Sequence, residues 1–180
     1  MLKSFLIVFV LAQASLFAHT GVGSISGFEA GFSHPIGGAD HILAMFAVGL
    51  WAAQMGGRSL WAVPLSFVAM MVVGAFLGMQ GVHVPLIEEG ILASILVLGA
   101  MIGFGVKMPV VFSSVLVGSL AIFHGTAHGN EMPLNASGVE YGIGFVLATG
   151  MVHLSGIVIG LIRAKSMKSK VSHMLKRTNV

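Results

Sequence analysis

The sequence predicts an all-α fold: a polytopic membrane helix bundle with about five transmembrane helices after an N-terminal signal peptide. Of the 180 residues, 56% are hydrophobic and only 8% are charged, whereas a soluble domain carries about a quarter charged residues. With a mean hydropathy of +0.98, the chain cannot cover itself with a water-facing surface. This composition excludes a soluble enzyme and a nucleic-acid binder. The sequence has no cysteine, which excludes disulfides, thiolate catalysis and iron–sulfur clusters.

Residues 1–18 have the features of a secretory signal peptide. Lys3 supplies a short positive region, and residues 5–11 supply an apolar stretch that is too short to span a bilayer. Small residues then offer cleavage points at residues 12–14 and at Ala18. An uncleaved first helix is the alternative. In either case we expect the segment that follows to lie outside the cytoplasm.

Five further segments are long and apolar enough to be membrane spans, each of which needs about 20 residues. These segments are 38–55, 59–80, 90–106, 109–128 and 139–162. The third is short, and glycine or proline separates the segments. We therefore expect a five-helix transmembrane domain at residues 19–162, followed by a basic cytoplasmic tail at residues 163–180.

The positions of the charged residues predict the orientation. Arg58 lies between the first two spans, Lys107 lies between the third and fourth, and the remaining basic residues after the signal follow the fifth. These places fall on one side of the membrane, which the positive-inside rule makes cytoplasmic. All six acidic residues fall on the other side. The mature N-terminus is therefore expected outside and the C-terminus inside.

Glycines recur at a four-residue spacing that lets membrane helices approach closely. The pairs are Gly74/Gly78, Gly99/Gly103, Gly138/Gly142 and Gly156/Gly160. They predict a tightly packed bundle and not a wide aqueous pore.

The first histidine cluster, residues 34–41 (HPIGGADH), enters the first predicted span. If this segment is helical throughout, His34 and His41 fall within about 20° of each other on the helix. The two glycines at positions 37 and 38 could instead break the helix, which would bend the backbone and let Asp40 join the imidazoles. The sequence leaves both alternatives open.

The second cluster, residues 123–131 (FHGTAHGNE), leaves the fourth predicted span. His124 and His128 are one helical turn apart and Glu131 follows three residues later, so these side chains project within roughly 60° of one another. Two imidazoles at this spacing commonly hold a transition metal. The pair alone is a weak signal, and it gains strength from a second cluster at the same depth. A scaffold of hydrogen-bonded core histidines is the alternative.

His153 extends this pattern into the membrane. It lies 13 residues after Glu140, about 20 Å along a helix, and therefore near the middle of the bilayer. Ionisable groups at such depth are costly and are functional by default. The histidines thus indicate a route for an ion. Imidazole and carboxylate donors without thiolates suit Ni²⁺, Co²⁺ or Zn²⁺ better than Cu⁺.

Four further segments, in addition to the two histidine clusters, are similar to those of a known protein family. They are residues 42–54 (ILAMFAVGLWAAQ), residues 56–61 (GGRSLW), Gly144-Phe145 and residues 149–153 (TGMVH). Together with the clusters they resemble the HupE/UreJ family of bacterial nickel permeases. The resemblance covers residues 19 to about 162, nearly the whole predicted mature chain.

The resemblance implies an inner-membrane permease, not an enzyme, that imports Ni²⁺ or Co²⁺ from the periplasm and supplies the maturation of hydrogenase or urease. By motif, the implied metal-handling residues are His34, Asp40, His41, His124, His128 and Glu131. The resemblance also favours cleavage of the signal peptide before His19. The free amine and the imidazole of His19 would then form a chelating pair. No permanently bound cofactor is expected, because the metal is the substrate. The expected partners are a divalent metal ion and the lipid bilayer, with a homo-oligomer left open.

Three other functions compete with import. An intramembrane zinc-dependent hydrolase would use the same His/Asp cluster to activate water. A haem-binding electron carrier would use spanning histidines as axial ligands. A metal sensor or accessory subunit would bind the ion without transporting it.

Overall fold

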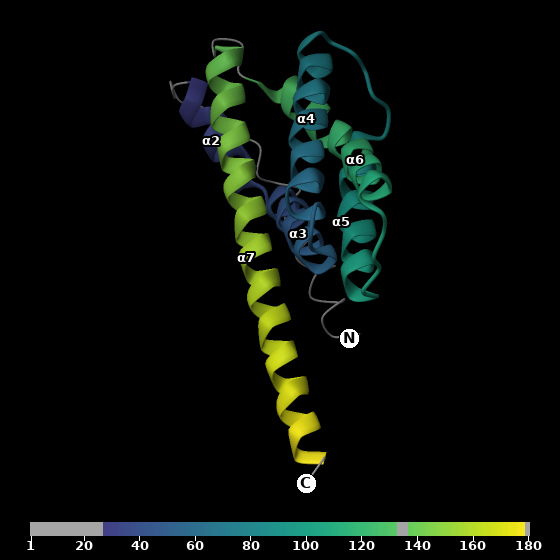
Figure 1. Ribbon diagram of the computed structural model, residues 1–180. Coiled ribbons are helices and arrows are strands. Elements are labelled where there is room, and N and C mark those ends of the chain that lie inside the picture. Colours follow the sequence, from purple (N-terminus) through teal and green to yellow (C-terminus); the bar gives the residue numbers. More distant parts are fainter. Residues whose placement is uncertain (1–26, 133–136, 179–180) are drawn as a thin grey trace.

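The computed structural model of the protein describes residues 27–132 and 137–178. The predicted signal peptide at residues 1–18 and the candidate ligand His19 lie outside the described residues. Within the described ranges every regular element is an α-helix, which confirms the all-α prediction (Figure 1). The helices are α2 (Gly27–Gly37), α3 (Ala39–Met55), α4 (Ser59–Met79), α5 (Ile87–Gly103), α6 (Val110–Glu131) and α7 (Gly138–Thr178).

The helix ends follow from glycine and proline. Gly56 after α3 and Gly105 after α5 adopt positive φ angles of 73° and 67°, a region that side chains with a Cβ disfavour. Pro109 directly precedes α6, where its missing N–H costs nothing. These residues end α3 and α5 and start α6 close to the predicted boundaries.

Three helical segments are long and apolar enough to cross a membrane: α4, α6 and the Gly138–Met167 part of α7. The α2–α3 pair passes the same test as one span with a bend of 80°, which makes up to four. Helix α3 matches the predicted first span over residues 38–55, but it passes the test only together with α2, so the pair forms a broken span or a re-entrant loop instead of one straight span. Helix α5, with 17 residues, is as short as the sequence suggests and falls below the length of about 20 residues that a span needs.

Three tight helix pairs organise the bundle: α4 packs with α6, and α7 packs with both α3 and α2. A Cβ at Gly74 of α4 would lie 2.5 Å from the Ile122 carbonyl oxygen of α6, and one at Gly125 would overlap the Met71 carbonyl. Glycine on both sides therefore brings the α4 and α6 backbones into contact. Figure 1 shows α7 along one side of the bundle, with its C-terminal part extending past the other helices.

The glycine pairs predicted to pack do so in part. Gly74/Gly78 and Gly156/Gly160 each face a neighbouring helix closely. Gly99 and Gly103 face open space, with no described atom within 4 Å of a built Cβ. For that pair in α5 the prediction of helix packing within the chain is wrong. It is also wrong for Gly138/Gly142, because a Cβ at Gly142 would meet no described atom within 4 Å and one at Gly138 would meet only methionine side chains at ordinary contact distance.

Trp51 ties α3 to the end of α5. Its side chain is fully buried, and its indole N–H donates to the Val106 carbonyl oxygen at 2.9 Å. Close by, the Gln54 amide donates to the Ile102 carbonyl oxygen at 3.2 Å. The loops that carry Arg58 and Lys107 therefore meet at the same end of the bundle, as the charge pattern predicts.

We expect Trp51→Phe to lower the free energy of unfolding by about 1–2 kcal/mol, because it removes this hydrogen bond and part of a fully buried ring. The control is Trp61→Phe, since Trp61 is 53% exposed and should change stability by less than about 0.5 kcal/mol. Thermal unfolding of the detergent-solubilised protein, followed by circular dichroism, compares the two variants. Equal stability of both would show that the Trp51 bond contributes nothing.

Candidate metal centre

The chain bends sharply between the two halves of the first histidine cluster. Gly38 has φ −104° and ψ 123°, which is extended and not helical, and α2 and α3 meet there at 80°. A Cβ at Gly38 would lie 2.7 Å from Asp40 Oδ1 and 2.9 Å from His41 Nδ1, so a larger residue would displace both side chains. Of the two alternatives that the sequence left open, the broken helix is the one observed. His34 thus lies in the last turn of α2, and Asp40 and His41 lie in the first turn of α3.

The second cluster lies on one face of α6, as its spacing predicts. His124 and His128 are fully buried, while Glu131 at the end of the helix is exposed. Gly125 and Gly129 lie on the opposite contact, where α6 packs against the α4 backbone. The alternation of histidine and glycine therefore turns the imidazoles towards α2 and α3.

The two clusters meet at the end of the bundle formed by α2 and α6. His34 Nε2 lies 3.1 Å from Glu131 Oε2. One donor atom each from His34, His128 and Glu131 lies within 4.8 Å of the other two. Ligands around a metal at about 2.1 Å are at most about 4.2 Å apart, so small side-chain movements would bring these three atoms into one coordination sphere. We name His34, His128 and Glu131 the outer trio.

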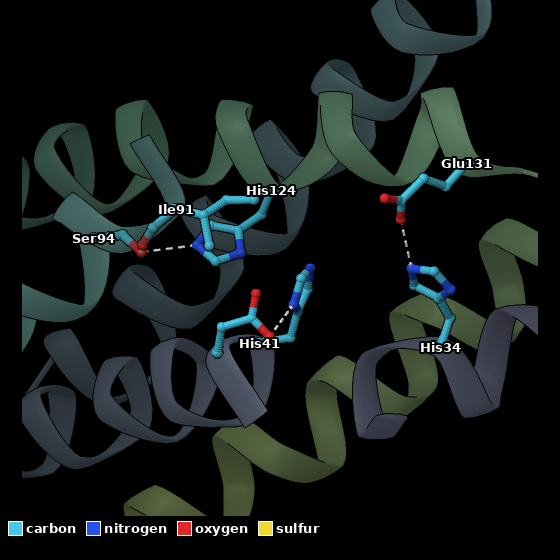
Figure 2. A network of polar contacts seen from close by, with 7 residues as sticks. His34, His41, Ile91, Ser94, His124 and Glu131 are labelled. Carbon is cyan, nitrogen blue, oxygen red and sulfur yellow. Dashed lines mark hydrogen bonds and ion pairs between the residues drawn. The ribbon is translucent and has the colours of Figure 1, made fainter. Parts of the chain in front are cut away.

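Imidazole rings continue inwards from the outer trio. The His128 ring centroid lies 4.7 Å from that of His34 and 4.4 Å from that of His41, and His41 lies 5.4 Å from His124. Figure 2 shows His34, His41 and His124 turned into the space between α6 and the bent α2–α3 pair. All four histidines of the two clusters therefore form one chain of neighbouring rings.

Each inner imidazole has a polar partner at one nitrogen. Asp40 Oδ1 lies 2.9 Å from His41 Nδ1, and the Ser94 hydroxyl lies 2.8 Å from His124 Nε2. Asp40 thus supports its neighbour His41 and belongs to the inner part of the cluster. Such partners orient a metal-binding imidazole.

Exposure falls steeply along this chain. The Glu131 and His34 side chains are 35% and 23% exposed, whereas His128, His41 and His124 are buried. An ion from solution would therefore meet Glu131 and His34 first. The buried imidazoles, with His128 of the outer trio as the first of them, lie behind these two side chains.

Among the described residues, His153 has a ring contact with Phe67 and with neither histidine cluster. It is 2% exposed, and its Nε2 has no hydrogen-bond partner within the part of the chain that the structure describes. The Phe67 ring lies between, with its centroid 5.5 Å from His124 and 5.2 Å from His153. The structure therefore places His153 one aromatic ring beyond the histidine chain.

Sequence reasoning missed three residues of this site. Ser94 contacts His124, Phe67 contacts His124 and His153, and Tyr141 lies 6.2 Å from His34 between ring centroids. None of the three belongs to a set of polar residues at helical spacing, so the sequence pattern does not mark them as site residues. Only the packing of α4, α5 and α7 against the histidines brings them to the site.

The sequence model of a family described as HupE / UreJ protein matches residues 7–178. The chain belongs to the HupE/UreJ family. Protein HupE of Rhizobium leguminosarum bv. viciae is 41% identical over 146 residues, which cover 81% of this chain and 76% of that protein. No solved structure gives a significant match.

Membership of the HupE/UreJ family agrees with the all-helical membrane fold and indicates the general class of function. HupE/UreJ proteins are of the nickel/cobalt transporter type, in line with the expectation that this chain is not an enzyme. Several apolar helices make this HupE/UreJ protein a multi-pass membrane protein.

Proposed function

We propose that the protein imports Ni²⁺, with Co²⁺ as a second substrate, across the bacterial inner membrane and supplies metalloenzyme maturation such as that of hydrogenase or urease. The observation that carries this proposal is the outer trio, in which three donor atoms from α2 and α6 lie within 4.8 Å of one another. Residues 34 and 131 are 97 positions apart in the chain. Family membership supports the same class of substrate.

The donor set favours a borderline divalent ion. Two imidazoles and one carboxylate suit Ni²⁺, Co²⁺ and Zn²⁺, and no thiolate is available to select Cu⁺. The carboxylate of Glu131 also offsets part of the charge that a divalent ion brings to a half-buried position. We infer that the ion is captured here as it sheds water.

Transfer would proceed from ring to ring. His128 hands the ion to His41 and His124, which are its neighbours along the chain of imidazoles. His153 would receive it after the Phe67 ring moves aside, since that ring contacts both histidines. His19, with its free amine after signal cleavage, would assist capture at the outside.

The membrane potential provides a sufficient driving force in this proposal. Inward movement of charge is worth about 2.3 kcal/mol per unit charge per 100 mV, or about 4.6 kcal/mol for a divalent ion. This corresponds to roughly a thousandfold accumulation. The required orientation has the outer trio facing the periplasm and the C-terminus in the cytoplasm. The neighbouring Arg58 and Lys107 loops at the opposite end support it.

Metal accumulation in cells tests the proposal. A bacterial host without its own nickel importers is given the native gene or an empty vector, and cellular Ni²⁺ and Co²⁺ are measured by mass spectrometry. We expect several-fold more Ni²⁺ with the native gene, and less when Co²⁺ is present in excess. Accumulation of neither metal at good expression would contradict import and favour a non-transporting metal binder or the zinc hydrolase.

A further inference from the structure

Ser94 makes two short polar contacts at the same time. It lies in α5 and is fully buried. Its hydroxyl oxygen is 2.6 Å from the Ile91 carbonyl oxygen and 2.8 Å from His124 Nε2 (Figure 2). Neither the family match nor the sequence pattern assigns this serine a role.

The protons in these contacts can be assigned from chemistry alone. A carbonyl oxygen carries no hydrogen, so an oxygen–oxygen distance of 2.6 Å requires the Ser94 hydroxyl to donate to Ile91. The hydroxyl has one proton, and it therefore accepts from His124. His124 Nε2 must then carry the ring hydrogen, which leaves the lone pair of the neutral imidazole on Nδ1.

His124 Nδ1 is the nitrogen on the side of the route. It is buried and has no hydrogen-bond partner among the described residues. Figure 2 shows it turned to the His41 side of the ring, and the His41 ring centroid lies 5.4 Å away, nearly perpendicular at 90°. A lone pair here, and not an N–H, is what a metal ion needs.

The carboxylate of Asp40 influences which ring nitrogen of His41 carries the hydrogen. Asp40 Oδ1 at 2.9 Å from His41 Nδ1 favours a hydrogen on that nitrogen, because a carboxylate accepts and does not donate. Both His41 ring nitrogens are buried without a hydrogen bond of good geometry in the described part of the chain, so Asp40 acts on Nδ1 as a close negative charge, and Nε2, away from that charge, is left to carry the lone pair. The two facing rings thus each present one acceptor nitrogen.

We propose that Ser94 is a positioning residue of the metal route: its hydroxyl fixes His124 as the Nε2–H tautomer and thereby presents Nδ1 to a divalent cation. The inference rests on the proposed function for the identity of the ion. Without the Ser94 acceptor, His124 loses the partner that selects this tautomer. Removal of a residue that hydrogen-bonds a metal-binding imidazole typically weakens metal affinity by about 10- to 100-fold.

The binding arm of the test uses purified full-length protein in detergent, titrated with Ni²⁺ by calorimetry. We expect Ser94→Ala to weaken Ni²⁺ binding by about 10- to 100-fold, and Ser94→Thr, which keeps the hydroxyl, to restore most of the affinity. The matched control is Ser113→Ala. Ser113 is also fully buried, but within the described residues its hydroxyl donates only to the carbonyls of Pro109 and Val110, one helical turn before it.

The tautomer arm needs neither transport nor metal. Nitrogen-15 spectra of histidine-labelled protein separate N–H from lone-pair ring nitrogens, and the difference from His124→Gln identifies the His124 signals. We expect an N–H at Nε2 in the native protein and a shift towards the other tautomer in Ser94→Ala. A native His124 with its hydrogen on Nδ1 would overturn the proposal. So would a Ser94→Ala variant that matches Ser113→Ala in both Ni²⁺ affinity and spectrum.

The two arms also separate this inference from the proposed function. A protein that accumulates neither metal in cells overturns import. The spectra of the metal-free protein still decide whether Ser94 sets the tautomer of His124.

Discussion

His128→Ala should reduce nickel accumulation to the level of the empty vector, the largest effect that we expect from any substitution in the route. His128 belongs to the outer trio and its ring also lies 4.4 Å from that of His41. Of the two histidines in the outer trio it lies nearer to His41, because the His34 ring is 6.3 Å from that of His41, and it therefore links capture to onward transfer. Loss of a group that only supports a ligand costs about 10- to 100-fold, and loss of a ligand at the junction should exceed this.

The measurement is the initial rate of Ni²⁺ accumulation at matched protein level in the membrane. His83→Ala is the control, because His83 is exposed in the loop between α4 and α5 and lies outside both clusters. It should accumulate Ni²⁺ like the native protein. If His128→Ala retained more than about half of the native rate while monodisperse in detergent, the chain of imidazoles would not be the route.

The sequence predicted the parts of this structure that depend on local periodicity. Apolar length identified α4, α6 and the membrane part of α7, and the spacing of His124, His128 and Glu131 placed them on one face of α6. It could not choose between a straight and a broken first span. The two glycines at positions 37 and 38 permit a break in the helix, but packing against other helices decides whether the break forms. The bend of 80° shows that the helix is broken there.

The rest of the site depends on contacts between helices that are distant in the chain. Ser94 meets His124 across 30 positions, and His34 meets Glu131 across 97. No spacing rule within one helix reports such a contact. Glycine spacing has the same weakness, since the Gly74/Gly78 and Gly99/Gly103 pairs look alike in sequence but only the first faces a neighbouring backbone.

Gly125→Ala should unfold or strongly destabilise the bundle, with a loss of about 3 kcal/mol or more. A Cβ at this position would overlap the Met71 carbonyl oxygen of α4. Overpacking of a core usually costs about 1–3 kcal/mol when side chains can adjust. Here the obstacle is backbone in the middle of a long helix, so α4 and α6 must separate as whole helices. The measurement is unfolding of the detergent-solubilised protein, followed by circular dichroism.

The same substitution at Gly99 isolates the cause. Gly99 is also inside a helix, but it has no described heavy atom within 4 Å of a built Cβ. Gly99→Ala should leave stability unchanged or raise it by up to about 1 kcal/mol, the difference in helix propensity. Because the two variants add one methyl group each, any difference between them comes from the α4–α6 contact. Loss of stability in Gly99→Ala would instead require a neighbour against α5, as a second copy of the chain would provide.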